Sequence, residues 1–432
     1  MGTNKKSGEL KIALVGAGSN SFGKAVIVDV LSSRDLAKKD TTLFLMDINE
    51  LALKKMFLFA GMVKEYKKTT VKILAASNYR EALSGADYVI TSVAKKRMEC
   101  WEKDFCIPVS LGFKHVLGEN GGPGAAFHTL RSLNLMIPVC REMERFCPEA
   151  LLLNFTNPES RICLGVNKLT RIKAVGLCHG AFGTLQAVSK ILGKKEKDID
   201  LEIGGINHFH WALSIKDKKS GKDLYPEFRK KIKEGDVGPL AYLLYRKFGL
   251  LPFPSDNHIG EYISFAYDIC GPFWLKYAEQ IGHPEYPDRI KQIVDGKISL
   301  TPDFVRPSAE LAVPIITDVE FDRNRKELSV NILNKSRAVP NLPEDAIVEV
   351  PAVVNGEGIH PVKVDPLPEA IASMCLTQIA IQNLLIRAYS EKSKDILLQA
   401  LILDPIVDSM PRAEKMMETL IRVEKNLLPE LR

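Results

Sequence analysis

The chain has 432 residues, of which 46% are hydrophobic and 26% are charged. This length suits two or three structural units of about 150 residues each, and the balance is typical of a folded globular protein. The net charge of +6 arises from 59 basic and 53 acidic residues, and the lysine-rich runs near 193 and 216 are mixed with acids. The charge pattern therefore indicates solvated loops and not a nucleic-acid-binding surface.

The sequence indicates neither secretion nor a membrane span. Residues 1–16 lack the apolar core and cleavage site of a signal peptide and lead into a strand. No apolar run reaches the roughly 18 residues that a membrane helix needs. The eight cysteines are scattered, and apart from Cys178 we interpret them as small buried side chains. We predict a cytoplasmic protein whose partner is a small molecule, with no nucleic acid or membrane.

The first predicted unit is a strand, a glycine loop and a helix. Residues 9–23, ELKIALVGAGSNSFG, combine an apolar strand with the loop, and residues 24–33 have helical spacing. Gly16 permits a tight turn, and Gly18 lets the backbone approach a pyrophosphate held at the helix N-terminus. Ser21 stands where the dinucleotide fingerprint has its third glycine.

The second strand, TTLFLMDIN, ends at Asp47, where an acid binds the ribose hydroxyls and repels a 2′-phosphate. The pattern therefore favours NAD over NADP. In the alternative interpretation the loop binds nothing and Asp47 caps the next helix. The residues predicted to bind the cofactor are Gly16, Gly18, Ser19, Asn20, Asp47, Ser92 and Asn157.

Further strands alternate with helices, which predicts a doubly wound parallel sheet. The predicted strands are 71–77, 86–94, 150–158 and 171–180, and the helices between them include 79–85 and 127–146. Ligands of such sheets bind at the carboxyl ends of the strands. The polar or reactive residues at these ends are Ser92, Asn157, Cys178 and His179.

We predict an α/β fold with two domains. Residues 1–200 form a Rossmann-like, NAD-binding, doubly wound sheet. Residues 201–432 form an α+β domain, similar to the C-terminal domain of lactate and malate dehydrogenases, that binds metal and substrate and mediates oligomerisation. Within it, residues 341–362 read as a strand pair, and the apolar faces of the helices in 367–405 suit either the core or a subunit contact.

Residues 201–217 read as one strand carrying His208 and His210. Together with Cys178 at another strand end, a histidine here can bind a divalent ion that leaves positions open for substrate oxygens. The alternative is a buried thiol and two packed core histidines. In residues 251–268, Asp256 is either a helix cap or a catalytic base, and its spacing alone favours the cap.

Eight motifs in this order make the chain similar to glycoside hydrolase family 4, the NAD-dependent glycosidases, over nearly its full length. The motifs are LVGAGSNSFG, LMDIN, NFTNP, GLCHG, GINHFHW, SDNHIGEY, NLPEDAIVEVPA and LILDP. The chain departs from the family at Ala17 and in its SNSFG loop. The resemblance implies oxidation of the sugar at C3 by NAD⁺, loss of the C2 proton, elimination of the aglycone, water addition and re-reduction, with a divalent metal, usually Mn²⁺, polarising the ketone.

The resemblance also implies roles for individual residues. Cys178 and His208 match the metal ligands, Asp256 matches a proposed C2 base, with Tyr262 nearby as the alternative, and Asn157 matches a residue beside the sugar and nicotinamide. Metal bound through a thiolate should be weakly held, and Cys178 partly exposed and open to oxidation.

His179 follows the metal-binding cysteine, and on an extended segment its side chain would point away from that of Cys178. The CHG form resembles the family branch that acts on α-linked uronic acids, glucuronides or galacturonides. We therefore expect His179 to contact the substrate or to assist protonation of the leaving group. The cations considered for the substrate carboxylate are Lys95, Lys96, Arg97 and Arg306.

Three other functions are weighed against this one. Within the family, the alternative is an α-glucosidase or α-galactosidase. Outside it are a dehydrogenase of the lactate or malate type, which would release NADH, and a dinucleotide-sensing protein without catalysis. The resemblance also implies a homodimer or homotetramer, while the sequence does not identify the uronic acid, the aglycone or the leaving-group acid.

Overall fold

The protein is described from a computed structural model that covers residues 8–274 and 288–432. Six strands form the parallel core of its main sheet in the spatial order 3-2-1-4-5-6, the order of dinucleotide-binding folds. They are β1 (Glu9–Val15), β2 (Asp40–Met46), β3 (Lys72–Ala76), β4 (Tyr88–Thr91), β5 (Leu151–Asn154) and β6 (Ala174–Gly176). The predicted strands and the α/β fold class are confirmed.

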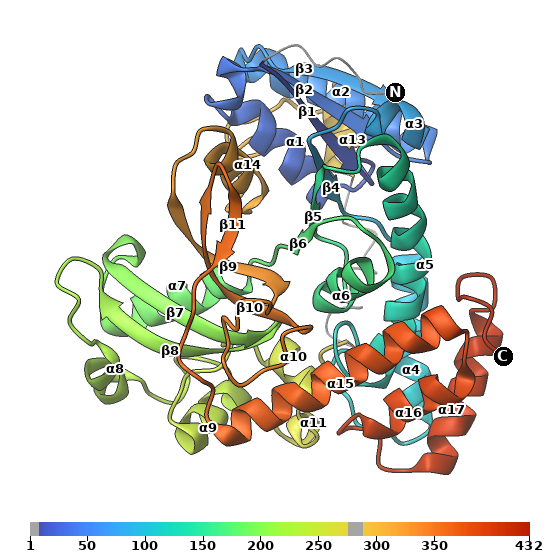
Figure 1. The fold of residues 1–432 in the computed structure, drawn as a ribbon, viewed down its shortest axis with the longest axis vertical. Coiled ribbons are helices and arrows are strands. Elements are labelled where there is room, and N and C mark those ends of the chain that lie inside the picture. Colours follow the sequence, from blue (N-terminus) through green and yellow to red (C-terminus); the bar gives the residue numbers. More distant parts are fainter. Residues whose placement is uncertain (1–7, 275–287) are drawn as a thin grey trace.

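Three strands from the second half extend this sheet. They are β9 (Arg325–Leu333), β10 (Ile347–Asn355) and β11 (Gly358–Pro361), which confirms the strand pair predicted over 341–362. β9 runs antiparallel to β6 and meets it where Gly176 pairs with Asn331. The sheet thus has nine strands and crosses the predicted boundary at residue 200 (Figure 1).

Helices cover both faces of the sheet because its strands are apolar on both sides. Along β1, Ile12 and Leu14 pack in one core cluster with α1, α2, α13 and α14, whereas Ala13 and Val15 pack on the other face with α3, α5 and α6. These helices are α1 (Phe22–Ser32), α2 (Glu50–Lys67), α3 (Tyr79–Leu83), α5 (Gly122–Phe146), α6 (Glu159–Leu169), α13 (Arg289–Val294) and α14 (Ala312–Glu320).

The segment predicted as one strand over 201–217 is a hairpin instead. β7 (Ile199–Ile206) and β8 (Phe209–Asp217) pair antiparallel around a two-residue connection, Asn207 and His208. The prediction was wrong because apolar residues continue on both sides of a turn that contains neither glycine nor proline. In Figure 1 this hairpin lies on the left, with α7 (Gly180–Leu192), α8 (Tyr225–Lys231) and α9 (Pro239–Phe248) around it.

The remaining described elements are helices and 3₁₀ turns spread along the chain. They are α4 (Arg97–Ser110), α10 (Asp256–Ile259), α11 (Ala266–Cys270), α15 (Glu369–Glu391), α16 (Lys394–Leu403), α17 (Met410–Val423), and the 3₁₀ turns η1 (Leu36–Lys38), η2 (Glu196–Asp198) and η3 (Gly260–Tyr262). By length and composition α15 is apolar enough to cross a membrane, but half of its most apolar stretch is buried and it packs on α5, α6 and α16. Such packing is that of a core helix.

All eight cysteines are free, in agreement with the absence of a disulfide framework. The interpretation of seven of them as buried side chains holds for five. Cys106 is exposed and Cys270 is half-buried. Cys106 lies in α4 and Cys270 ends α11, and both helices leave one face to solvent.

Candidate active site

Two cavities meet at the carboxyl ends of the parallel strands. A groove of about 480 Å³ runs over the glycine loop. A second cavity of about 940 Å³ lies between the end of β6, the turn of the β7–β8 hairpin and the loop before α10. The side chains shared by both are Phe22, Arg97, Phe155 and Asn157. The groove and the cavity are therefore adjacent, and a ligand bound in one can contact a ligand bound in the other.

The glycine loop is shaped by two close approaches. Gly16 has φ +87°, and a Cβ there would lie 2.3 Å from the carbonyl oxygen of Ser92. A Cβ on Gly18 would lie 2.7 Å from Oδ2 of Asp47, which accepts the Gly18 N–H at 2.8 Å. Only glycine fits at either position, which leaves the backbone open to the groove.

Six of the seven residues predicted for the cofactor line this groove: Gly16, Gly18, Ser19, Asp47, Ser92 and Asn157. Asn20 is not among the lining residues, and its side chain accepts a hydrogen bond from Lys55 Nζ at 2.6 Å. The alternative in which Asp47 caps the next helix is also answered, because the cap of α2 is Asn49, whose side chain accepts the Ala52 N–H at 3.1 Å.

Cys178 and His179 follow the end of β6 and line the second cavity together. The segment is not extended at His179, whose φ and ψ are −80° and −5° because it precedes the first turn of α7. The expected opposite orientation of the two side chains therefore does not apply. Burial raises the pKa of the Cys178 thiol, and its sulfur accepts the Gly180 N–H at 3.4 Å. Burial lowers the pKa of His179, whose ring stacks on Phe182.

The hairpin separates its two histidines into different environments. His208 occupies the turn with φ +61°, lines the cavity, and has a buried Nδ1 without a hydrogen-bond partner. His210 is completely buried, and both of its ring nitrogens are bonded, Nδ1 to Glu349 at 2.9 Å and Nε2 to Thr184 at 2.8 Å. His210 is thus a packed core histidine, whereas His208 has a nitrogen left for a ligand.

Asp256 does not reach the cavity, contrary to the expectation for a catalytic base. Its Oδ2 accepts the Leu240 N–H at 3.0 Å and its Oδ1 accepts the Ala241 N–H at 2.9 Å. The carboxylate therefore caps the N-terminus of α9, a different helix from the one it opens. Asp256 is therefore a helix cap, as its spacing favoured. The helix that it caps, however, is not the one that follows it but α9, which begins more than ten residues earlier in the sequence.

The loop after Asp256 supplies other groups. His258 stacks on His208 with ring centroids 4.2 Å apart, and its Nδ1 also has no partner. Ligand atoms of His208, His258 and Glu261 all lie within 4.8 Å of one another. Burial, followed by the charge of Glu119, raises the pKa of Glu261 to about 8. The sequence showed these residues close together, but not their approach to His208.

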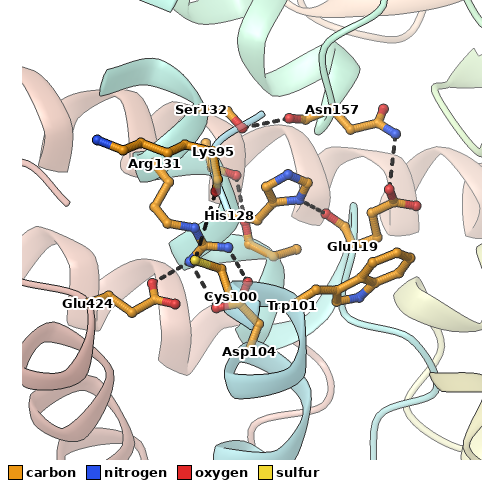
Figure 2. Close-up of polar contacts among 12 residues, drawn as sticks. Lys95, Cys100, Trp101, Asp104, Glu119, His128, Arg131, Ser132, Asn157 and Glu424 are labelled. Atoms are coloured by element: carbon orange, nitrogen blue, oxygen red, sulfur yellow. Dashed lines mark hydrogen bonds and ion pairs between the residues drawn. The ribbon is translucent and has the colours of Figure 1, made fainter. Parts of the chain in front are cut away.

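Glu119 lines the cavity and joins it to the groove. Its Oε1 pairs with Arg97 at 2.6 Å. The same oxygen accepts a hydrogen bond from the Asn157 amide at 3.3 Å, which Figure 2 shows. Burial raises the pKa of Glu119, but the charges of Arg97, His128 and His258 outweigh burial and leave it below the ordinary value. Sequence reasoning missed Glu119, whose only signal is an acid within the glycine-rich GENGGPG.

Figure 2 also shows what lies beneath the groove wall. His128 Nδ1 bonds to the carbonyl oxygen of Glu119 at 2.8 Å, and its ring lines the groove. One turn further along α5, Arg131 pairs with Asp104 and Glu424, all three buried. This triad ties α4, α5 and the end of α17 together under the groove wall and contributes no atom to the second cavity.

Of the four cations considered for a substrate carboxylate, Arg97 lines the second cavity. Lys95 and Lys96 line the nucleotide groove, and Arg306 is exposed and pairs with Asp303. Lys190, on α7, also lines the second cavity, and sequence reasoning missed it. The positive charge that faces this cavity therefore does not come from the lysine pair after β4.

The fold and the two cavities define an α/β protein with a dinucleotide-type groove that opens into a site of thiol, imidazole and carboxylate groups. Two sequence profiles match the chain, "Family 4 glycosyl hydrolase" over residues 11–194 and "Family 4 glycosyl hydrolase C-terminal domain" over residues 203–407. The chain belongs to glycoside hydrolase family 4, and it is a glycosidase. The resemblance seen in its motifs is confirmed, and the dehydrogenase and non-catalytic alternatives are set aside.

Its relatives differ in the sugar that they are named for. The chain is 30% identical to an α-glucosidase of Erwinia rhapontici over 95% of this chain and 97% of the relative. It is 30% identical to an α-galactosidase of Bacillus subtilis, covering 97% and 99%. It is 26% identical to an α-galacturonidase of Lachnoclostridium phytofermentans, covering 99% and 98%.

Solved structures agree on the fold. A 6-phospho-α-glucosidase from gut microorganisms, in complex with NAD and Mn²⁺, superposes with a TM-score of 0.85 at 20% identity, covering 98% of this chain and all of that one. A malate dehydrogenase of Plasmodium falciparum superposes with a TM-score of 0.52 at 14% identity, covering 90% and 99%. The second likeness agrees with the predicted dehydrogenase-like architecture.

Proposed function

We propose that the protein hydrolyses α-glycosides of uronic acids through oxidation and elimination at the sugar ring. The observation that carries this proposal is the content of one cavity, which gathers Cys178, His179 and His208 with the cations Arg97 and Lys190. Cationic side chains beside the reacting groups suit a carboxylate at C6 of the sugar. A relative named as an α-galacturonidase covers nearly the full chain.

The residues present fit a dinucleotide and a divalent ion. The glycines of the loop leave the groove open where a side chain would clash, and Asp47 lies at the ribose end. The unpartnered Nδ1 of His208, in a cavity that also holds the Cys178 thiol, suits a metal ligand. When bound, NAD⁺ supplies reversible hydride acceptance at C3 and Mn²⁺ supplies a Lewis acid for the sugar oxygens.

Two ligand sets for the ion share His208. The first is Cys178 with His208, as the family resemblance implies. The second is His208 with His258 and Glu261, whose ligand atoms lie close together. A nitrogen and oxygen set suits Mn²⁺ better than a soft thiolate does. We retain the first set as the proposal, because Cys178 opens directly on the cavity, and the second set is its competitor.

The remaining groups take roles by position. Asn157 stands where groove and cavity meet and orients the sugar edge that faces the cofactor. We place His179, half-buried at the cavity wall, in contact with the substrate beside the leaving group, since its lowered pKa favours the neutral ring over a proton donor. Since Asp256 caps α9, we assign the acceptor of the C2 proton to Glu119, an ionised carboxylate in the cavity, and not to Asp256.

The second candidate function is hydrolysis of neutral α-glucosides or α-galactosides. It is favoured by two carboxyl groups on the cavity wall, Glu119, which already pairs with Arg97, and Glu310. Glu119→Gln separates the candidates, because it releases Arg97. Because the same change also removes the proposed proton acceptor and should stop turnover, the readout is equilibrium binding. For a uronide enzyme, the Kd of the free uronic acid should fall about fivefold, as expected for roughly 1 kcal/mol of freed ion pairing, whereas the Kd of the neutral sugar should stay unchanged.

The experiment that tests the proposal is turnover of aryl α-glucuronides and α-galacturonides in D₂O with NAD⁺, Mn²⁺ and a thiol reductant. Deuterium at C2 of the released sugar, read by NMR, with no net NADH, is the expected result. Cleavage of neutral α-glycosides alone would move the protein to the second candidate. Cleavage by enzyme freed of NAD⁺, with no deuterium at C2, would overturn the oxidation and elimination route, because an enzyme that returns the abstracted proton before exchange would still need the cofactor.

A further inference from the structure

A chain of buried hydrogen bonds connects the elements that carry the two proposed metal ligands. It runs from Thr184 on α7, through His210 on β8, to Glu349 on β10, with distances of 2.8 and 2.9 Å. The second oxygen of Glu349 accepts the hydroxyl of Ser329 on β9 at 2.9 Å. All four side chains are fully buried.

Two members of this chain of hydrogen bonds, Thr184 and His210, belong to elements next to a metal ligand. α7, which carries Thr184, begins two residues after Cys178. β8, which carries His210, begins directly after His208. β9 and β10, which carry Ser329 and Glu349, are strands of the main sheet and are distant in sequence from both metal ligands. The hydrogen bonds therefore connect two ligand-bearing segments to a common anchor in the sheet.

Another polar link between the hairpin and the main sheet, from Lys326 on β9 to Asp200 on β7 at 2.9 Å, is exposed and lies at the end of the hairpin away from its turn. The turn that holds His208 has an unfavourable positive φ, and the hairpin is a separate two-stranded sheet that makes no ladder hydrogen bonds with the nine-stranded sheet. Apolar packing between β7 and β10 resists separation, but it is not directional. The His210–Glu349 pair supplies direction, since a carboxylate accepts from Nδ1–H only along its lone pairs.

We infer that Glu349, acting through His210 and Thr184, is a positioning residue that sets the separation of Cys178 and His208 for the divalent ion. Neither His210 nor Glu349 is itself a ligand. Both ring nitrogens of His210 are hydrogen-bonded, and the two carboxylate oxygens of Glu349 accept hydrogen bonds from His210 and Ser329. Groups that orient metal ligands from outside typically change metal affinity by about 10–100-fold when removed. The inference rests on the proposed function, since it presumes an ion at these ligands.

The test is Mn²⁺ affinity, read by the EPR signal of free Mn²⁺, with NAD⁺ affinity measured in parallel by calorimetry. Glu349→Ala should weaken Mn²⁺ binding about 10–100-fold and leave NAD⁺ binding unchanged. Glu349→Gln keeps an oxygen for His210 and should restore most of the affinity. Glu327→Ala is the matched control, because Glu327 is a buried carboxyl on β9 outside this chain of bonds.

Other outcomes overturn the inference in distinguishable ways. Mn²⁺ affinity of Glu349→Ala within twofold of the wild type would remove the positioning role. A parallel loss of Mn²⁺ and NAD⁺ affinity would show a general structural defect instead. If Glu349→Ala does not fold, Thr184→Val breaks the other end of the connection and must weaken Mn²⁺ binding alone. Absence of Mn²⁺ binding in the wild-type protein would instead refute the proposed ion site itself.

Discussion

The nucleotide groove and the second cavity are built in different ways. The groove lies over the glycine loop at the ends of neighbouring parallel strands, and there its shape depends on two glycines, Gly16 and Gly18, where a side chain would clash. The cavity is assembled from side chains on a strand end, a hairpin turn, two loops and a helix that are far apart in the sequence. Ligand binding in the groove should therefore be sensitive to added side-chain atoms, and ligand binding in the cavity should be sensitive to the removal of side chains.

The largest effect should follow removal of a cavity ligand. We expect Cys178→Ala and His208→Ala each to weaken Mn²⁺ binding by more than about 100-fold, since even partners of ligands are worth roughly 10–100-fold. NAD⁺ binding should not change. EPR titration of Mn²⁺ measures the loss, with the exposed Cys106→Ala as the control for the thiol.

The same titration sharpens the description of the cavity. If Cys178→Ala retains Mn²⁺ affinity while His258→Gln loses it, the ion is held by His208, His258 and Glu261. The proposed pair would then be wrong, although the cavity would remain the site of the ion.

A smaller effect, confined to the groove, is expected from an added methyl group. Gly16→Ala places a Cβ against the Ser92 carbonyl at a φ that costs roughly 1–2 kcal/mol for other residues, so NAD⁺ affinity should fall about tenfold or more. Mn²⁺ affinity should remain that of the wild type. Gly61→Ala, on α2 with nothing within 4 Å of its added Cβ, should leave NAD⁺ affinity unchanged, and a loss there would contradict this account.

The smallest effect concerns pH. Burial, followed by the charge of Asp29, raises the pKa of Glu310 from 4.5 to about 7. The folded protein thus holds an extra proton between these values, so the contribution of this carboxyl to stability is complete below about pH 4.5 and is lost as the pH rises through 7. From pH 5 to 8, the Tm of the wild type should fall about 1–3 °C more than that of Glu310→Gln. Thermal melts at each pH measure this difference, and the exposed Glu430→Gln should follow the wild type.

The groove was predictable from sequence because its signals are local. A strand, a glycine turn and an acid at the next strand end lie within one stretch, and they define both the fold class and most lining residues. Asn20 is the one residue of the predicted set outside the lining of the groove, because the direction of its side chain depends on a hydrogen bond from Lys55, which lies in a different element.

The cavity was less predictable because its groups meet through tertiary packing. Cys178 and His208 were found through family motifs, yet the turn that exposes His208 contains neither glycine nor proline and was overlooked. Asp256 was misplaced because its partners, the N–H groups of α9, are distant in sequence. Glu119 has no periodic pattern around it, and only its pairing with Arg97 and Asn157 reveals its role.

The antiparallel join between β6 and β9 has a mechanical consequence. Gly176 pairs with Asn331 only two residues before Cys178, so the two halves of the chain share one sheet next to the site. A hinge rotation of one half against the other would shear this pairing and displace the thiol. We therefore expect the main sheet to resist a hinge rotation of one half against the other at this point, next to Cys178.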